Sequence, residues 1–168
     1  MPINAQVLLS VLSHESTSGD ISQTLRVTPA TYALSLGDGT GANQAQVAWS
    51  DSRTFPAGGE DSFAIRSLTD DRGTVSITAV KVLYIKNTGS EQITIRAGGA
   101  LQESWEGLGY SNDTGEPGET TLKAGAAIIL ADPTAAGIPA NSSADTIYLQ
   151  AAPGATYDIV LIGEGTIT

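Results

Sequence analysis

Residues 74–96 read TVSITAVKVLYIKNTGSEQITIR, and this stretch decides the fold. In the run Val75–Ile85, apolar residues first alternate with polar ones and then follow each other with only Lys81 between them. Alternation with a period of two is typical of a β-strand, and a strand that becomes apolar on both sides is typical of the centre of a sandwich or barrel. A buried helix is the competing interpretation, which the many β-branched residues disfavour.

Two pairs of neighbouring runs predict β-hairpins. Gln92–Ile95 is a second β-type run, and Lys86–Glu91, which separates it from Val75–Ile85, contains the turn formers Asn, Ser and Gly. Further on, Thr146–Gln150 and Thr156–Ile162 are joined by a segment with Pro-Gly, a strong turn signal. We therefore expect an antiparallel hairpin in each place.

The rest of the chain repeats this pattern of short apolar runs between polar turns. Further β-type runs lie at residues 5–12, 21–36, 44–55, 63–68, 101–105 and 121–130. Pro29 interrupts the second of these, which predicts an edge strand or two strands that meet at a bend. The polar segments His14–Asp20 and Gly107–Glu119 are expected to be loops, with a solvated His14.

These runs determine the expected fold class. No amphipathic helix pattern is present, so the strands should pair with each other rather than alternate with helices. We expect one all-β domain over residues 1–168, an antiparallel β-sandwich of jelly-roll type with about nine or ten strands; a barrel is the alternative. Residues 1–12 are either its first strand or an arm for assembly.

Composition and charge exclude several classes of function. The net charge is −10, of which residues 1–96 carry −2 and residues 97–168 carry −8. Such a charge repels phosphate backbones and anionic lipids, so we expect neither a nucleic-acid nor a membrane partner. The uneven distribution suggests the hypothesis that the first half faces a protein partner while the acidic second half faces water. The first residues lack the pattern of a signal peptide, and we expect synthesis in a cytoplasm.

The chain offers little for catalysis. It has one histidine, no cysteine and no G-x-S-x-G motif, so Ser-His-Asp and Cys-His sites lack their partners. Two carboxylates suffice for a glycosidase, and Glu103 and Glu106 on either side of Trp105 leave that option open. Asp70 and Asp71 are better explained as turn residues than as a metal site. We therefore expect no enzymatic activity, no cofactor and no metal.

Apolar and aromatic side chains near loops or near the N-terminus are the candidate contact residues. For those on the N-terminal run and in the strands, the alternative is a place in the protein's own core. For those beside the Gly107–Glu119 loop, the alternative is packing at the base of that loop. The candidates are Ile3, Val7, Leu9, Tyr32, Trp49, Phe55, Trp105, Leu108 and Tyr110.

Several segments resemble a family of small tailed-phage virion proteins. They are LSLGDGTGANQAQVAWSDSRTF (34–55), SFAIRSLTDDRGTVSITAVKVLYIKN (62–87), the turn at 97–100, TLKAGAAIILADPTAAG (121–137) and ATYDIVLIGEG (155–165). In that family a Gly-Asp-Gly turn leads into a strand with Ser-Asp-Ser or a similar motif, and a Tyr-Asp-Ile-Val strand closes the chain. The similarity covers most of residues 34–165, and its motifs are structural.

The resemblance implies a head decoration, or cement, protein on the capsid surface of a virion. Its partner would then be the major capsid protein, and it would assemble as a homotrimer. Two other interpretations remain: a tail or neck protein of the same virion, and a carbohydrate- or receptor-binding module. The latter would use Trp105 and Tyr110 as stacking platforms beside the Gly107–Glu119 loop.

Overall fold

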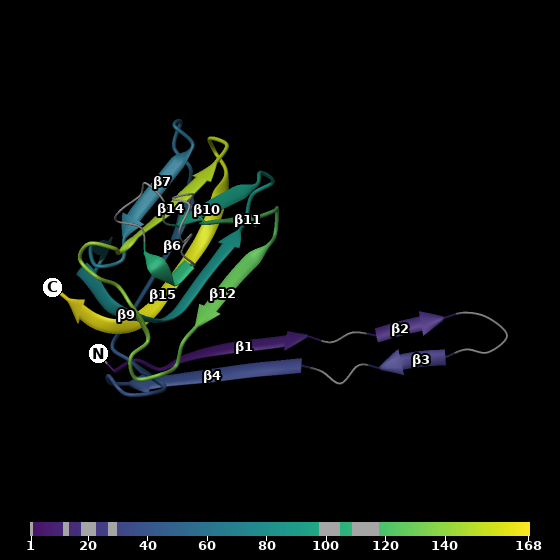
Figure 1. Cartoon of the computed structure of the whole chain (residues 1–168), viewed down its shortest axis with the longest axis horizontal. Helices are drawn as coiled ribbons and strands as arrows, with labels where there is room; N and C mark the ends of the chain where they lie inside the picture. Colours follow the sequence, from purple (N-terminus) through teal and green to yellow (C-terminus); the bar gives the residue numbers. More distant parts are fainter. Residues whose placement is uncertain (1, 12–13, 18–22, 27–29, 98–104, 109–117) are drawn as a thin grey trace.

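The computed structural model describes residues 2–11, 14–17, 23–26, 30–97, 105–108 and 118–168. These residues form a β-sandwich and a long hairpin that projects from it (Figure 1). The hairpin contains β1 (Ala5–Val11), β4 (Ala30–Asp38) and, further out, β2 (His14–Thr17) and β3 (Gln23–Arg26). A short 3-10 turn, Glu106–Leu108, is the one helical element in the described residues.

The sandwich consists of two antiparallel sheets. The first has the order β12-β9-β15-β6 and comprises Ala127–Ala131, Gly73–Asn87, Thr156–Ile167 and Val47–Thr54. The second has the order β11-β10-β14-β7 and comprises Gly118–Leu122, Ile93–Ala97, Thr146–Ala151 and Glu60–Ala64. The short strands β5 (Gln44–Ala45), β8 (Leu68–Asp70) and β13 (Ile138–Pro139) pair with β4, β9 and β9 respectively.

The order of these eight strands is that of a jelly roll. Along the chain, the first to the eighth of them are β6, β7, β9, β10, β11, β12, β14 and β15. The first sheet then contains the first, eighth, third and sixth strands side by side, and the second sheet contains the second, seventh, fourth and fifth. Two Greek keys folded against each other give this order, and all pairs within both sheets are antiparallel. The predicted all-β class and the antiparallel sandwich are confirmed.

Neither predicted hairpin forms, because each pair of neighbouring runs is divided between the two sheets. β9 and β10 belong to different sheets, and so do β14 and β15. At the end of β9 the buried amide of Asn87 donates to the carbonyls of Glu91 (2.6 Å) and Leu122 (3.0 Å), and its Oδ1 accepts from the N–H of Gly89 (3.0 Å). These bonds hold the connection as a crossing from sheet to sheet.

Other boundaries also differ from the sequence prediction. The run at 121–130 is two strands, β11 and β12, which are separated by a turn with Gly125 at φ 74°. Part of the expected loop His14–Asp20 is strand β2, paired with β3. Strands β3 and β4 lie on either side of residues 27–29, which are outside the described residues, so the predicted bend at Pro29 stays a prediction. Residues 101–104, for which the sequence predicts a short strand, lie outside the described residues.

The main core lies between the two sheets and accounts for most of the buried apolar surface. Its aromatic side chains contact each other in pairs: Trp49 and Phe63 have ring centroids 5.9 Å apart, and Phe55 and Tyr157 have theirs 5.3 Å apart. Trp105 is fully buried at one end of this core, where its indole N–H donates to the carbonyl of Pro139 (2.9 Å). Burial of such rings is the main favourable term for this fold.

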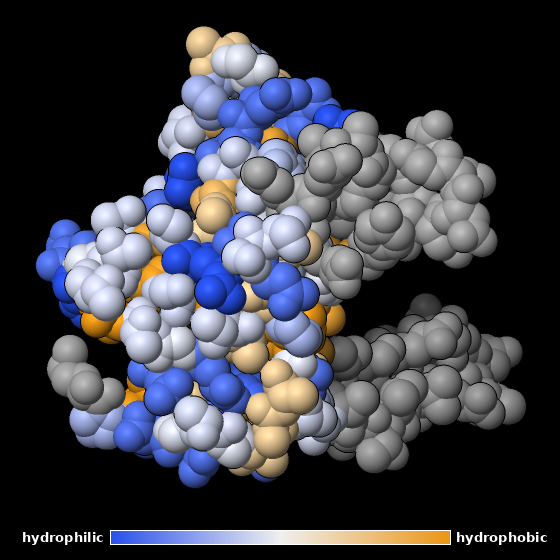
Figure 2. All heavy atoms as spheres, turned by 60° about the vertical axis from the view of Figure 1, so that its left-hand side comes forward, coloured by the Kyte–Doolittle hydropathy of each residue, from blue (hydrophilic) through white to orange (hydrophobic). Residues whose placement is uncertain are grey.

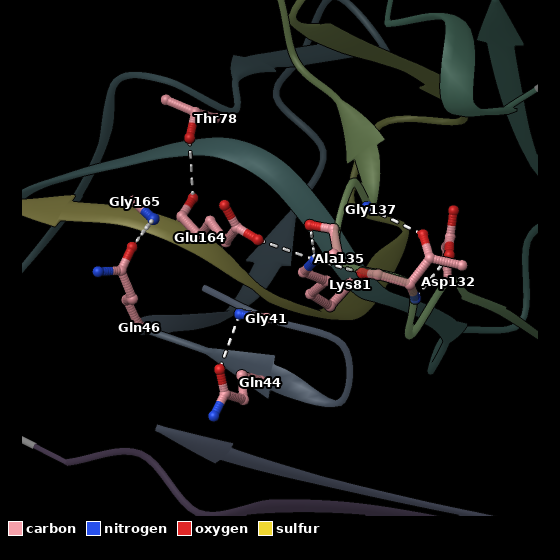
Figure 3. Close-up of polar contacts among 11 residues, drawn as sticks. Gly41, Gln44, Gln46, Thr78, Lys81, Asp132, Ala135, Gly137, Glu164 and Gly165 are labelled. Atoms are coloured by element: carbon pink, nitrogen blue, oxygen red, sulfur yellow. Dashed lines mark hydrogen bonds and ion pairs between the residues drawn. The ribbon is translucent and has the colours of Figure 1, made fainter. Parts of the chain in front are cut away.

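Two polar clusters tie strands together around the core. Lys81 on β9 is fully buried, and its Nζ donates to the carbonyls of Thr134 (2.5 Å) and Ala135 (2.8 Å) and pairs with Glu164 Oε1 on β15 (2.9 Å; Figure 3). Two ammonium protons therefore have carbonyl acceptors, and the ion pair with Glu164 compensates the buried charge. The cluster fixes the segment after β12 onto the first sheet.

The second polar cluster joins the two sheets. Arg53 on β6 makes two hydrogen bonds of 2.9 Å to the carboxylate of Asp61 on β7, which also accepts a bond from the hydroxyl of Tyr157 on β15 (2.8 Å). The Arg53 guanidinium lies 5.5 Å from the ring centre of Phe63. Burial, followed by the bond to Asp61, raises the pKa of Tyr157 well above its usual range, so the hydroxyl stays protonated.

Candidate functional site

The hairpin of β1 and β4 is the part of the molecule that extends away from the sandwich (Figure 1). The two strands pair from Ala5 with Leu36 at the base to Val11 with Ala30 further out. Because opposite residues share a side of the ribbon and sides alternate along each strand, one side collects apolar residues. We call it the apolar ribbon face; it consists of Ala5, Val7, Leu9, Tyr32, Leu34 and Leu36.

The base of the apolar ribbon face packs on the outer side of the first sheet. Leu34 and Leu36 are buried there in a second apolar cluster with Val82 of β9 and Ile162 of β15. The same cluster partly buries Ile3, Ala5 and Val7 of the N-terminal run. Ile3 and Val7 are two of the predicted contact residues. The N-terminal run therefore contains strand β1, which belongs to a separate sheet with β4, and its base is part of the protein's own packing.

The outer half of the apolar ribbon face has no such cover. Leu9 and Tyr32 lie opposite each other on the two strands, and their exposed fractions are 45% and 41%. Full burial of an exposed apolar side chain contributes about 1.5–3 kcal/mol, and covering the part that is still exposed on each of these two contributes somewhat less than half of that. A hairpin of two strands is also only marginally stable by itself in water. This half of the ribbon is therefore suited to contact with another surface.

A second exposed apolar strip lies on the first sheet beside the ribbon. The register places Ile129, Tyr84 and Val160 side by side on β12, β9 and β15, next to the row that contains Val82 and Ile162. Ile129 is 39% exposed, and Tyr84 and Val160 are partly exposed. A hollow of about 420 Å³ adjoins Tyr84 and Val160. Sequence analysis missed this strip, because all three residues lie in strands that look buried on both sides.

Several predicted contact residues are instead part of the core. Trp49, Phe55 and Trp105 have exposed fractions of 4%, 3% and 0%, so the alternative of a place in the protein's own packing holds for these three candidates. Leu108 is partly buried and packs against the same core. Tyr110 lies outside the described residues.

The burial of Trp105 also decides against it as a platform for sugars. Its ring is enclosed and its N–H is already bonded to Pro139, so neither side of the indole is open for stacking. Gly107 lies so close to the ring that a Cβ there would overlap with it. Glu103, one of the two carboxylates considered for glycoside hydrolysis, lies outside the described residues.

The two halves of the chain do not form separate faces, which corrects the hypothesis based on their charges. In each sheet, strands from residues 1–96 alternate or pair with strands from residues 97–168: β9 and β6 flank β15, and β14 lies between β10 and β7. The surface shown in Figure 2 is mostly hydrophilic or neutral, with small separate hydrophobic patches. Acidic and near-neutral segments are therefore interleaved.

Asp70 and Arg72 form a local charged pair on the surface. Asp70 accepts hydrogen bonds from the guanidinium and the backbone of Arg72, and these bonds lower the pKa of the Asp70 carboxyl.

Within the described ranges, no three His, Asp or Glu side chains come together as metal ligands would. No helix among the described residues has the length and apolar character needed to cross a bilayer.

Comparisons with known proteins do not extend these observations. A scan against models of protein families found no match, and no curated protein or solved structure matched the chain either.

Proposed function

We propose that this chain is a non-enzymatic structural protein of a tailed-phage virion, and that it decorates the head and stabilises the capsid. Its partner is then the major capsid protein, and it acts on the capsid surface after synthesis in the host cytoplasm. The observation that carries the proposal is the exposed outer half of the apolar ribbon face, with Leu9 and Tyr32 on a ribbon that leaves the sandwich.

Three further observations support this role. Residues 34–165 resemble small virion proteins in the motifs quoted above. Jelly rolls occur repeatedly in viral capsid proteins, although the fold alone does not determine a function. An arm that lies on a neighbouring subunit and buries apolar side chains there is a common way for β-proteins to join an assembly.

The ribbon suits the mechanical task of a decoration protein. The sandwich has a continuous core of its own and is tied further by the buried Lys81 cluster. The ribbon is anchored at Leu34 and Leu36 and extends its outer half away from that rigid body. Contacts made there connect a stable domain to the coat without unfolding either one. We propose a homotrimer, as the resemblance implies.

Binding to capsids tests the proposal. The purified chain is mixed with capsids that lack it, from the phage whose genome encodes it, and binding is measured by co-sedimentation. We expect the wild-type chain to bind and the double variant Leu9→Ser/Tyr32→Ser to lose at least tenfold in affinity, because about 1.4 kcal/mol of lost contact gives that factor.

A matched control uses the other side of the same ribbon. Thr31→Ala/Ser35→Ala changes two exposed residues that neighbour Tyr32 and Leu34 but point away from the apolar ribbon face. This variant should bind like the wild type. Absence of binding by the wild-type chain, or equal binding by both double variants, would overturn the proposal. Binding to purified tails instead of heads would move the protein to the tail or neck.

A further inference from the structure

The free edge of β1 differs from the edges of the sandwich at β6, β7 and β11, which all carry charged residues. β1 is the outer strand of its sheet, and no strand in the described ranges pairs with that edge. Its sequence, AQVLLSV, has no charged residue, proline or glycine. Soluble proteins usually protect such an edge with charge, proline or a bulge, because its unpaired N–H and C=O groups recruit other strands. The edge strand β6, for comparison, carries Asp51 and Arg53.

Leu8 stands at the centre of this unprotected edge. Its exposed fraction is 69%, the highest among the large apolar side chains of the described residues. It lies on the side of the ribbon opposite to Leu9, where the pairing register places Ala33 beside it. Neither the sandwich nor the apolar ribbon face explains this leucine.

The order of apolar and polar residues along β1 is the same in both directions. Around Leu8, the neighbours Val7 and Leu9 are both apolar, and the next pair, Gln6 and Ser10, are both polar. Two antiparallel copies centred on Leu8 therefore match apolar with apolar and polar with polar residues, and Leu8 meets its own counterpart. Such a strand is complementary to itself, which is the condition for pairing across a two-fold axis.

The match continues across the second strand of each ribbon. In this register one row of the combined sheet reads Ala33, Leu8, Leu8, Ala33, and the next reads Leu34, Val7, Leu9, Tyr32, both entirely apolar. The polar row reads Ser35, Gln6, Ser10, Thr31. Directly opposite side chains of the same kind stabilise a sheet, and the absence of charge means that no like charges meet despite the net charge of −10.

We propose that two copies of this chain pair through antiparallel β1 strands across a two-fold axis at Leu8. The result is one continuous sheet with the order β5-β4-β1-β1-β4-β5, which is more stable than two isolated ribbons because each hairpin gains a neighbour on its open edge. The pairing uses the edge of the ribbon and leaves the apolar ribbon face free. It goes beyond the proposed function, and as a two-fold contact it can join neighbouring trimers.

β12 is the competing edge. It is also uncharged, and Ile129 at its centre is exposed. However, it is shorter than β1, Asp132 follows it directly, and Ile129 is less exposed than Leu8. A single pair of short strands is a small interface beside the ~1,200–2,000 Å² of stable complexes, so we expect the pairing at high protein concentration or on an assembled surface.

Cysteine cross-linking tests the register, because the chain contains no cysteine of its own. Leu8→Cys should give a covalent dimer under copper-phenanthroline oxidation, since opposite Cβ atoms lie about 4.5–5.5 Å apart and a disulfide requires about 4 Å. Gln6→Cys alone should not, because the two copies of residue 6 are about 14 Å apart in this register, at about 3.4 Å per residue. A mixture of Gln6→Cys and Ser10→Cys proteins should cross-link.

Two further variants complete the test. Leu8→Lys places two positive charges on the axis, and its mass at high concentration should fall to half that of the wild-type assembly by light scattering, with an unchanged circular dichroism spectrum. Ile129→Cys should not cross-link. Equal cross-linking of Leu8→Cys and Gln6→Cys, or dimers from Ile129→Cys alone, would overturn the proposal. These readouts need no capsid, so their failure is distinct from a failure to bind heads.

Discussion

Leu9 and Tyr32 lie opposite each other across the two strands of the ribbon, two residue pairs beyond Val7 and Leu34, which pack on the sandwich. Both pairs lie on the apolar ribbon face, but the sandwich covers only the pair nearer to the base, Val7 and Leu34. The ribbon therefore changes from covered to exposed between these two pairs.

This difference predicts that equivalent substitutions in the two pairs change the stability by different amounts. Leu9→Ala should change the free energy of unfolding by about 0.5 kcal/mol or less, as is usual for exposed positions. Leu34→Ala should cost about 2–4 kcal/mol, because it leaves a cavity in the second apolar cluster. Urea unfolding followed by tryptophan fluorescence measures both values. Equal losses would mean that the outer half of the ribbon is packed as firmly as its base.

The Lys81 cluster should contribute strongly to stability. Lys81→Met removes the partner of Glu164 and the donor to two carbonyl groups. Breaking a buried pair on one side costs about 3–5 kcal/mol, and the partial exposure of Glu164 places the expected loss at the lower end. The double variant Lys81→Met/Glu164→Gln should recover part of it in the same urea measurement. A single variant as stable as the wild type would show that the cluster does not stabilise the fold.

Close backbone approach should make Gly163 and Gly165 of β15 intolerant of a side chain. A Cβ at Gly163 would overlap with the carbonyl of Ala79, and one at Gly165 with that of Ser76, where the pairing with β9 shifts register. Gly163→Ala should therefore lower stability by at least about 1–3 kcal/mol. Gly37→Ala is the control, because a Cβ at Gly37 would meet no atom within 4 Å. Differential scanning calorimetry compares the two.

The raised pKa of Tyr157 predicts a loss of stability in alkaline solution. Folding favours the neutral phenol, so its contribution is complete below the unfolded value of 10.0 and declines as the pH rises above it. Tyr157→Phe should lose about 1 kcal/mol near neutral pH with the bond to Asp61, and should decline less steeply above pH 10. Melting temperatures from neutral to about pH 11 test this. Parallel curves for both proteins would contradict it.

The sequence was a sound guide to what depends on local pattern. The run Val75–Ile85 identified the central strand, because the core between the sheets and the outer cluster both leave their apolar pattern on β9. The sequence was a poor guide to which strands pair with each other. The turn formers in Lys86–Glu91 serve a hairpin or a crossing equally well, and the buried bonds of Asn87 that distinguish the two depend on distant Leu122.

The candidate contact residues show the same limit. Val7 and Leu9 have the same character and the same alternation, so no local pattern reveals that the body covers one and not the other. Trp105 is close to a polar, glycine-rich segment, which predicts a place at the surface, yet Gly107 permits the ring to lie directly beside the backbone inside the core. Leu8 can be recognised in the sequence as the centre of a symmetric strand, but only the structure shows that this strand is an open edge.

The central claim is that the ribbon attaches this protein to the outside of a head. Cryo-electron microscopy of the virions whose genome encodes the chain tests it most directly. We predict density for the jelly roll on the outer capsid surface, with the side chains of Leu9 and Tyr32 against the coat. Density for the chain in the tail or neck, or a ribbon that points into solvent on the head, would contradict the claim.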